Sequence, residues 1–257
     1  MSALRVFIGW DSREDIAYQV CRHSLERHSS IPLEIIPVRQ NDLRMQGHYW
    51  RSPDPLSSTE FSFTRFLTPF LSDFDGWSVF VDCDFLFRGD IAGILDYRDE
   101  SKALMCVKHD YVPPEKTKMD GQIQTQYPRK NWSSFMLINC GHAQVRQLTP
   151  ELVNTASGLF LHRFNWLTDD VIGALPMTWN YLEGWHTKAD CDDPRAVHFT
   201  RGGPWFADYR DVEYGDEWID VSKSVLPESI GRLKSTGIDM VSSKTLPKEA
   251  ASRTTIY

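Results

Sequence analysis

The chain has 257 residues, of which 41% are hydrophobic and 25% charged, and its formal net charge is −7. This length allows one large α/β domain or two small ones. The acidic balance argues against nucleic acid as a partner, and no apolar run approaches the roughly 20 residues of a membrane span. The N-terminus lacks a signal-peptide pattern and the five cysteines are scattered, so we predict a cytoplasmic protein with reduced thiols.

The first quarter of the chain predicts a nucleotide-type fold. Residues 4–9 form an apolar strand, residues 13–25 have helical spacing with Asp11 or Ser12 as the cap, and residues 33–38 form a second strand. This order predicts a right-handed βαβ unit. Residues 40–59 are polar and broken by glycine and proline, which predicts a loop, and a helix is expected from about Thr59 to Leu71.

The strongest chemical signal follows the apolar strand of residues 77–81, where Asp82, Cys83 and Asp84 stand in a row. A continuous apolar run predicts a buried parallel strand, and ligands of open α/β sheets bind beyond the carboxyl ends of such strands. Two carboxylates there suit Mg²⁺ or Mn²⁺, and such an ion can hold phosphates. Taken alone, Asp-x-Asp is explained equally well by one acid that caps a turn and another that is solvated.

The remaining elements are shorter. We expect helices near residues 90–97, 148–155 and 169–175, and strands near 103–108, 133–139 and 196–199. Residues 110–131 lack periodicity and are locally basic, which is typical of either a functional loop or a solvated one. Residues 1–220 are predicted to form one domain, followed by a polar tail, residues 221–257, that is peripheral or partly disordered.

In order and spacing these signals resemble glycosyltransferases of the GT-A fold, over roughly residues 4–210. The resemblance is to the family-eight type, the retaining group that includes glycogenin and bacterial galactosyltransferases. It implies an α/β, Rossmann-like mixed sheet of mostly parallel strands flanked by helices. The matching positions are Asp82-Cys83-Asp84, Arg65 in the preceding helix, Leu137-Ile138-Asn139, Asp169-Asp170 with Leu175-Pro176 and Trp179-Asn180, and His198 with Pro204-Trp205.

The resemblance implies a metal-dependent hexosyltransferase. It would move a sugar from a nucleotide sugar, most simply a UDP-sugar, to a glycan, lipid-linked or protein acceptor with retention of anomeric configuration. Asp82, Asp84 and His198 would hold Mn²⁺ or Mg²⁺, and Asp169 or Asp170 would serve the reacting sugar. The nucleotide and diphosphate would contact Ile8, Gly9, Asp11, Arg65, Asp82, Cys83, Arg201, Gly202 and Gly203. The sugars would contact Lys130, Asn131, Trp132, Ser133, Asn139 and Trp205.

Elementary chemistry agrees with this assignment. A departing nucleotide diphosphate gathers negative charge, which a divalent cation and an arginine can neutralise. A lone histidine near a strand end is more often structural, but the Gly-Gly-Pro-Trp that follows His198 marks a tight loop where backbone can approach phosphate. Retention allows either a carboxylate nucleophile or same-face attack with the leaving phosphate as base. Asp169 and Asp170 can instead cap a helix.

Two departures from the family pattern and three alternatives accompany this prediction. The family's Asn-Ser/Ala-Gly turn is Trp132-Ser133-Ser134 here, with Asn131 one position early, and the lysine before Pro-Trp is Gly203. A haloacid-dehalogenase phosphatase fits Phe85-Leu86-Phe87 poorly, and a nucleotidyltransferase wants a glycine-rich first loop. A catalytically decayed nucleotide- or carbohydrate-binding protein is the third alternative.

Overall fold

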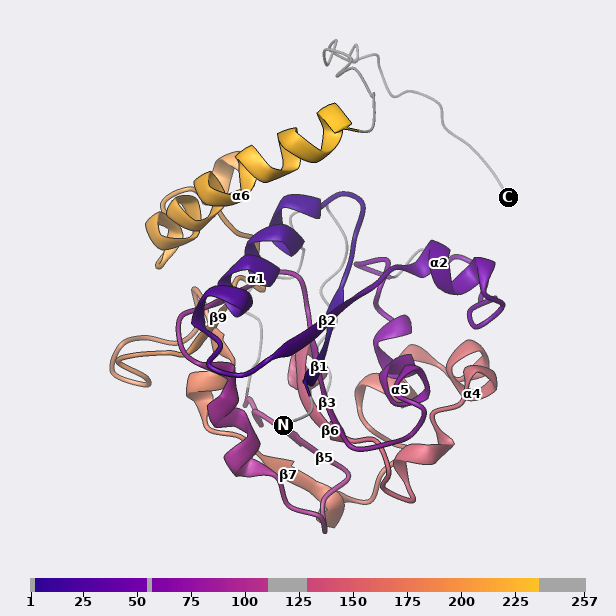
Figure 1. Ribbon diagram of the computed structural model, residues 1–257. Helices are drawn as coiled ribbons and strands as arrows, with labels where there is room; N and C mark the ends of the chain where they lie inside the picture. The colour runs from indigo at the N-terminus through magenta and orange to yellow at the C-terminus, as the bar shows by residue number, and fades with distance from the viewer. Residues whose placement is uncertain (1–2, 55–56, 111–128, 236–257) are drawn as a thin grey trace, which may run out of the picture.

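The fold is that of a computed structural model, which describes residues 3–54, 57–110 and 129–235, with side chains up to residue 225 (Figure 1). Its centre is a six-stranded sheet in the order β2-β1-β3-β6-β5-β7. Only β6 is antiparallel to its neighbours. This mixed, mostly parallel α/β sheet confirms the predicted fold class. The strands are β1 Leu4–Gly9, β2 Leu33–Val38, β3 Trp77–Val81, β5 Leu104–Cys106, β6 Phe135–Asn139 and β7 Ile172–Ala174.

A second, three-stranded sheet in the order β4-β9-β8 continues from the end of β3. Its strands are β4 Phe85–Phe87, β8 Tyr181–Leu182 and β9 Ala196–His198. Only three residues, Asp82, Cys83 and Asp84, lie between the end of β3 and the start of β4, and the chain crosses from one sheet to the other through them. These residues therefore lie where the two sheets meet.

Helices flank the central sheet (Figure 1). The helix α1 packs against β4 and α6, while α2, α4 and α5 gather on the other side of the sheet. The α-helices are α1 Asp15–His28, α2 Gln40–Met45, α3 Thr68–Leu71, α4 Pro150–Thr155, α5 Gly158–His162 and α6 Gly215–Ser235. The 3₁₀ turns are Thr64–Leu67, Ile91–Tyr97, Trp132–Ser134, Val145–Gln147, Asp169–Val171, Met177–Trp179 and Ala207–Tyr209.

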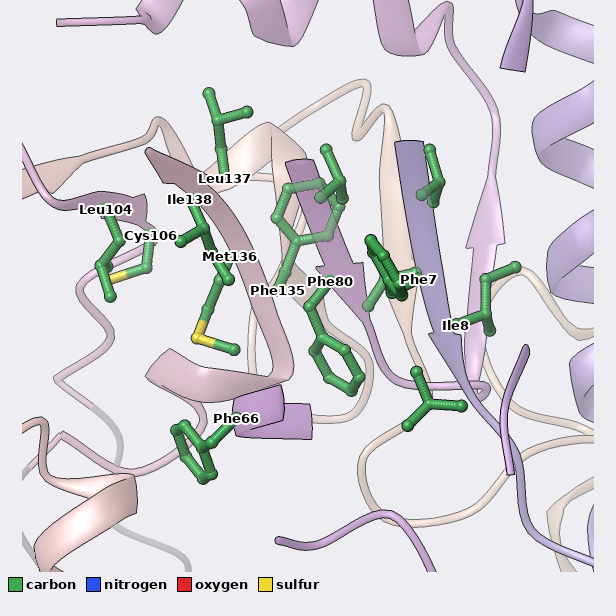
Figure 2. Close-up of a cluster of buried hydrophobic side chains, with 14 of the residues drawn as sticks. Phe7, Ile8, Phe66, Phe80, Leu104, Cys106, Phe135, Met136, Leu137 and Ile138 are labelled. Carbon is green, nitrogen blue, oxygen red and sulfur yellow. The ribbon is translucent and has the colours of Figure 1, made fainter. Parts of the chain in front are cut away.

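The core is continuous across the sheet. Phe7, Phe80 and Met136 stand at one register level on three neighbouring strands, and all three are at most 1% exposed. Figure 2 shows the side chains of Phe80 and Met136 on one side of the strands and the Phe135 ring on the other. Residues in register share a face of a sheet. This packing fixes the level at which each strand ends, and hence where its last residues meet.

Four local predictions are corrected by the structure. Part of the predicted loop of residues 40–59 is the helix α2, and residues 169–175 form a 3₁₀ turn and the edge strand β7 instead of a helix. The helix α1 begins at Asp15 without a side-chain cap, so neither Asp11 nor Ser12 caps it. The expected helix of residues 59–71 is a 3₁₀ turn that leads into α3, which has Pro69 in its first turn.

The C-terminal segment differs from the predicted tail at its start. The predicted boundary at residue 220 lies inside α6, whose Trp218, Val221 and Val225 are 3–7% exposed. These three residues follow helical spacing, and Trp218 and Val221 belong to a second apolar cluster. Residues 236–257 and most of the 110–131 loop lie outside the described residues. Among the described helices, none has the length and hydropathy needed to cross a membrane.

Candidate metal and donor site

Three side chains with metal-binding atoms meet where β3 ends. Asp82, Asp84 and His198 each place one ligand atom within 4.8 Å of the others, and within the described residues no other such group is found. The register explains the meeting: His198 on β9 pairs with Phe85 on β4, and the Phe199 N–H donates to the Asp84 carbonyl at 3.0 Å. The two carboxylates, 13% and 20% exposed, keep access to solvent, whereas the His198 side chain is 3% exposed.

The site holds negative charge at a cost. Burial raises the pKa of Asp82 to about 7, against the opposing effect of the Arg65 guanidinium. Burial also raises the pKa of Asp84, but the facing His198 lowers it further, so its pKa lies below the usual range. The two shifts differ because burial outweighs the neighbouring cation at Asp82, whereas the facing His198 outweighs burial at Asp84. A divalent cation between them would favour the ionised form of both carboxyl groups.

Arg65 is one such cation, and it is held firmly. Its Nη1 lies 2.7 Å from Asp82 Oδ1 and also donates to the Ser133 carbonyl at 3.0 Å. The guanidinium carbon lies 5.2 Å from the ring centroids of both Phe61 and Phe80. With Arg65 only 5% exposed, this arrangement fixes the Asp82 carboxylate.

His198 is oriented by Asn180, a residue that sequence reasoning placed in the Trp-Asn pair but not in the site. Asn180 is fully buried, and its Oδ1 lies 3.0 Å from His198 Nδ1. An amide oxygen only accepts hydrogen bonds, so Nδ1 carries the proton. The ring also stacks on Phe85, with centroids 4.3 Å apart. In the neutral ring, Nε2 therefore presents its lone pair to Asp84.

The arrangement fits a metal ion. His198 Nε2 lies 3.3 Å from Asp84 Oδ1, and within the described part of the chain this buried oxygen accepts no hydrogen bond. Two electron-rich atoms facing each other at this distance require a proton or a metal ion between them. Two carboxylates and one imidazole are a donor set for Mn²⁺ or Mg²⁺. The residues present thus suit the predicted ion.

The residues predicted near the nucleotide line the same end of β1. Ile8 is a fully buried core residue, and a Cβ on Gly9 would lie 2.4 Å from the Phe61 ring, so this position must be glycine. Asp11 is buried and accepts hydrogen bonds from the Arg13 backbone and guanidinium and from the Glu60 N–H. Although burial raises its pKa, these bonds keep the Asp11 pKa below its usual value. Cys83 points into the core, 1% exposed.

The loop after β9 packs inward. Gly202 has a φ of +123°, which favours glycine, and a Cβ on Gly203 would lie 2.0 Å from the Trp205 ring. Trp205 packs on Phe199, Phe206 and Trp218, in the apolar cluster beneath α6. Arg201 lies over Gly184. Gly203 thus has a packing role, and Trp205 is partly buried against this cluster, while its contact with a sugar stays a prediction.

The turn before β6 borders the site. The Trp132 Nε1 donates to the His109 carbonyl at 3.0 Å, and Ser133 Oγ lies 2.9 Å from His162 Nδ1. Asn131 adopts a left-handed conformation, with a φ of 64°, and Lys130 is 8% exposed. The adjoining Ser134 carbonyl accepts the Asp82 N–H at 2.9 Å, which connects this turn directly to the carboxylates.

Three predicted residues lie apart from the three metal-binding side chains, and their roles toward the sugars stay predictions. Because β6 runs antiparallel to β3, its last residue, Asn139, pairs with the first residue of β3, Trp77. Asp169 and Asp170 precede β7, whose first residue is level with Ser78 through β5 and β6. Four residues of strand, about 13 Å, separate that level from Asp82. Asn139, Asp169 and Asp170 therefore do not join the metal-binding group.

The two aspartates have partners of their own. Asp169 pairs with Arg129 and is 84% exposed. The Asp170 carbonyl accepts from Lys102 Nζ at 2.8 Å, and a hydrogen bond from Thr168 lowers the pKa of its carboxyl group. These contacts tie the start of an edge strand to its surroundings.

Two ionisable residues beside the site carry no motif that sequence reasoning could have used. Burial, with smaller contributions from Asp84 and Asp11, raises the pKa of Glu14 to about 7, and its carboxylate lies 3.9 Å from Cys83 Sγ. His109 is 7% exposed, with its ring centroid 5.4 Å from that of His186. Burial lowers the pKa of His109 to about 3, helped by His186.

The strand order, the crossing to a second sheet and the paired carboxylates define a GT-A-type glycosyltransferase fold, and comparison with solved structures agrees. The bifunctional glycosyltransferase WbbM matches 86% of the chain with a TM-score of 0.63 at 16% identity, although the match spans only half of WbbM. The glycosyltransferase GlyE of Streptococcus pneumoniae matches 90% with a TM-score of 0.57 at 15% identity, over 64% of its own chain. The galactosyltransferase LgtC, solved with donor and acceptor sugar analogues, matches 86% with a TM-score of 0.55 at 13% identity, over 96% of its length.

The sequence comparison is more specific. No protein-family model matches the chain. Protein CDI of Arabidopsis thaliana is 57% identical over 219 residues, which cover 84% of this chain and 85% of the plant protein. The chain therefore belongs to the same family as Protein CDI.

Proposed function

We propose that this protein is a metal-dependent glycosyltransferase that uses a nucleotide sugar, most simply a UDP-sugar. The observation that carries the proposal is the meeting of Asp82, Asp84 and His198 at the carboxyl end of β3 in a GT-A-type fold. This is the edge where ligands of such sheets bind. The resemblance to family-eight enzymes and the LgtC match support sugar transfer with retention of configuration.

Each residue of the site has a defined task. Asp82, Asp84 and His198 would hold Mn²⁺ or Mg²⁺, which when bound neutralises the charge of the departing diphosphate. Arg65, predicted to bind the diphosphate directly, is better placed to hold Asp82, because its Nη1 is already engaged by that carboxylate and by Ser133. Asp11, at the end of β1, remains the proposed neighbour of the nucleoside.

The position of Asp169 and Asp170 favours one of the two routes to retention. With both at the other end of the sheet, we assign neither as a nucleophile. In the same-face route, the bond from the anomeric carbon to the diphosphate breaks while the acceptor oxygen bonds to that carbon. The acceptor proton then passes to the leaving phosphate oxygen.

The acceptor is a hydroxyl-bearing glycan, lipid-linked sugar or protein. Five free cysteines, four of them buried, support a reducing compartment such as the cytoplasm.

The decisive experiment is calorimetric titration with UDP, GDP and ADP, each with and without Mn²⁺. We expect UDP to bind only with Mn²⁺, and binding to be lost in Asp84→Asn, which keeps the side-chain size but not the charge. The matched control is Asp96→Asn on an exposed 3₁₀ turn, which should bind like the wild type. Binding of none of the three nucleotides, or binding indifferent to Mn²⁺ and to Asp84, would exclude the proposal. Metal-dependent UDP binding without turnover of any UDP-sugar would instead support a binding protein.

A further inference from the structure

A chain of buried hydrogen bonds leads from the metal-binding group to the turn before β6. His198 contacts Asn180, Asn180 contacts Ser134, and Ser134 contacts the Asn131 carbonyl. Asn180 is fully buried and Ser134 is 3% exposed. Because these groups are shielded from water, each hydrogen must point toward an acceptor inside the protein.

The direction of each bond follows by elimination, starting from the far end. Asn131 offers a carbonyl oxygen, which can only accept, so Ser134 Oγ donates its one hydrogen there, at 2.7 Å. Ser134 Oγ must then act as an acceptor toward Asn180, 2.9 Å away. The amide nitrogen of Asn180 therefore faces Ser134, and it also approaches the Asn131 carbonyl at 3.5 Å.

These directions also fix the hydrogen bond between Asn180 and His198, at the end of the series nearest the metal-binding group. With its nitrogen turned toward Ser134, Asn180 presents Oδ1 to His198 Nδ1 at 3.0 Å. Nδ1 must carry a proton, which leaves Nε2 as the nitrogen available to a metal ion beside Asp84. A flipped amide would place its NH₂ against Nδ1 and would leave Ser134 and the Asn131 carbonyl without that donor. Leaving buried polar groups unpaired costs about 1–3 kcal/mol each.

We infer that Ser134 is a positioning residue that, through Asn180, selects the His198 tautomer whose Nε2 faces the two carboxylates. The inference rests on the proposed function only in the use made of that nitrogen. Ser134 also accepts the Asp82 N–H through its carbonyl, so one residue fixes both sides of the group. Sequence reasoning noted that Trp132-Ser133-Ser134 departs from the family turn that ends in glycine. This departure supplies the hydroxyl on which the chain of bonds depends.

The inference is tested first by ¹⁵N NMR of the histidine rings, with His198 identified by its loss in His198→Gln. Long-range ¹H–¹⁵N spectra distinguish protonated from unprotonated ring nitrogens. We expect His198 Nδ1 to be protonated in the metal-free protein and in the presence of Mg²⁺ and UDP. A metal-free wild-type protein in which Nε2 alone carries the proton would overturn the inference. This measurement requires neither turnover nor metal binding.

The second test compares two buried serines. Ser134→Ala removes the hydroxyl that Asn180 contacts, whereas Ser72→Ala removes a buried hydroxyl that contacts Ser78. Electron paramagnetic resonance titration of Mn²⁺ in the presence of UDP should show about tenfold weaker binding in Ser134→Ala and a change below about twofold in Ser72→Ala. Asn180→Ala should weaken binding at least as much as Ser134→Ala. Equal affinities in the two serine variants would refute the role of Ser134.

The two proposals fail in different ways. If wild-type protein binds no Mn²⁺ with UDP while His198 Nδ1 is protonated, the proposed function fails and the positioning role stands. If Mn²⁺ and UDP bind but Nε2 alone carries the proton in the metal-free protein, the positioning role of Ser134 fails and the proposed function stands.

Discussion

Asp82 and Asp84 stand at one end of the central sheet, and Asp169 and Asp170 stand at the other. The first pair is 13% and 20% exposed and faces Arg65 and His198, whereas Asp169 is 84% exposed and pairs with Arg129, whose side chain is 20% exposed. Buried charges interact strongly with neighbouring groups, and exposed ones are screened by water. The same residue type thus forms a site at one end of the sheet and a surface contact at the other.

The largest difference between the two ends should appear in stability. Replacing Arg65 by Met removes the cation beside half-buried Asp82, and breaking a buried ion pair in this way costs about 3–5 kcal/mol. At the other end, Asp169→Asn breaks an exposed pair with Arg129 and should cost about 1 kcal/mol or less. Urea denaturation without metal measures both free energies of unfolding. Similar losses in the two variants would contradict the comparison.

The next effect concerns activity. Asp82→Asn removes a proposed metal ligand, and we expect at least about 100-fold slower metal-dependent hydrolysis of the UDP-sugar that serves as donor, about 2.7 kcal/mol of transition-state stabilisation. Asp170→Asn should retain activity within about twofold, because Asp170 lies at the other end of the sheet. Activity assays at saturating Mn²⁺ compare the two. An Asp170→Asn variant as inactive as Asp82→Asn would return Asp170 to the catalytic group.

Two glycines extend the comparison to packing. A Cβ on Gly9, at the site end of β1, would lie 2.4 Å from Phe61, so Gly9→Ala should destabilise by about 1–3 kcal/mol through overpacking. At the other end, Gly141 would gain only ordinary contacts at 3.7 Å and 3.8 Å. Gly141→Ala should be neutral or stabilising by up to about 1 kcal/mol. Thermal unfolding of both variants checks the difference, and a destabilised Gly141→Ala would count against it.

A fourth effect is a dependence of stability on pH. The pKa of His109 is about 3 in the folded protein, below its ordinary value of 6.5, so between these values the unfolded chain binds a proton that the folded protein does not. The stabilisation is therefore complete above about pH 6.5 and is lost as the pH falls toward 3, at up to about 1.4 kcal/mol per pH unit. His109→Gln should flatten this slope between pH 6 and 4 in urea denaturation. A slope in His109→Gln as steep as that of the wild type would contradict this prediction.

The sequence was sufficient where the signal was local. The apolar run of β3 and the two aspartates after it located the edge of the sheet, and the strand predicted near residues 196–199 is confirmed as β9, which ends at His198. Strand direction was not local information. The apolar residues of β6 look the same in either direction, so the sequence did not show that Asn139 pairs with the first residue of β3.

Other errors arose because a pattern fitted more than one structure. The segment after Asp170 is short and apolar, and such a run does not distinguish a helix from an edge strand. The start of α6 did carry a helical signal in Trp218, Val221 and Val225, but the polar residues around them obscured it. The role of Asn180 depends on contacts with His198 and Ser134, which stand far from it in the chain and cannot be inferred without the fold.

The metal-binding group and the residues that hold it come from segments spread over most of the chain. Arg65 and the carboxylates come early, Ser134 and Asn180 follow, and His198 arrives last on β9. A ribosome delivers these segments in that order, so a nascent chain contains a close pair of aspartates well before its histidine exists. During this interval Arg65 is the cation available to Asp82. Arg65 and Asp82 are only 17 positions apart in the chain, so both partners of this ion pair are synthesised long before the strand that carries His198.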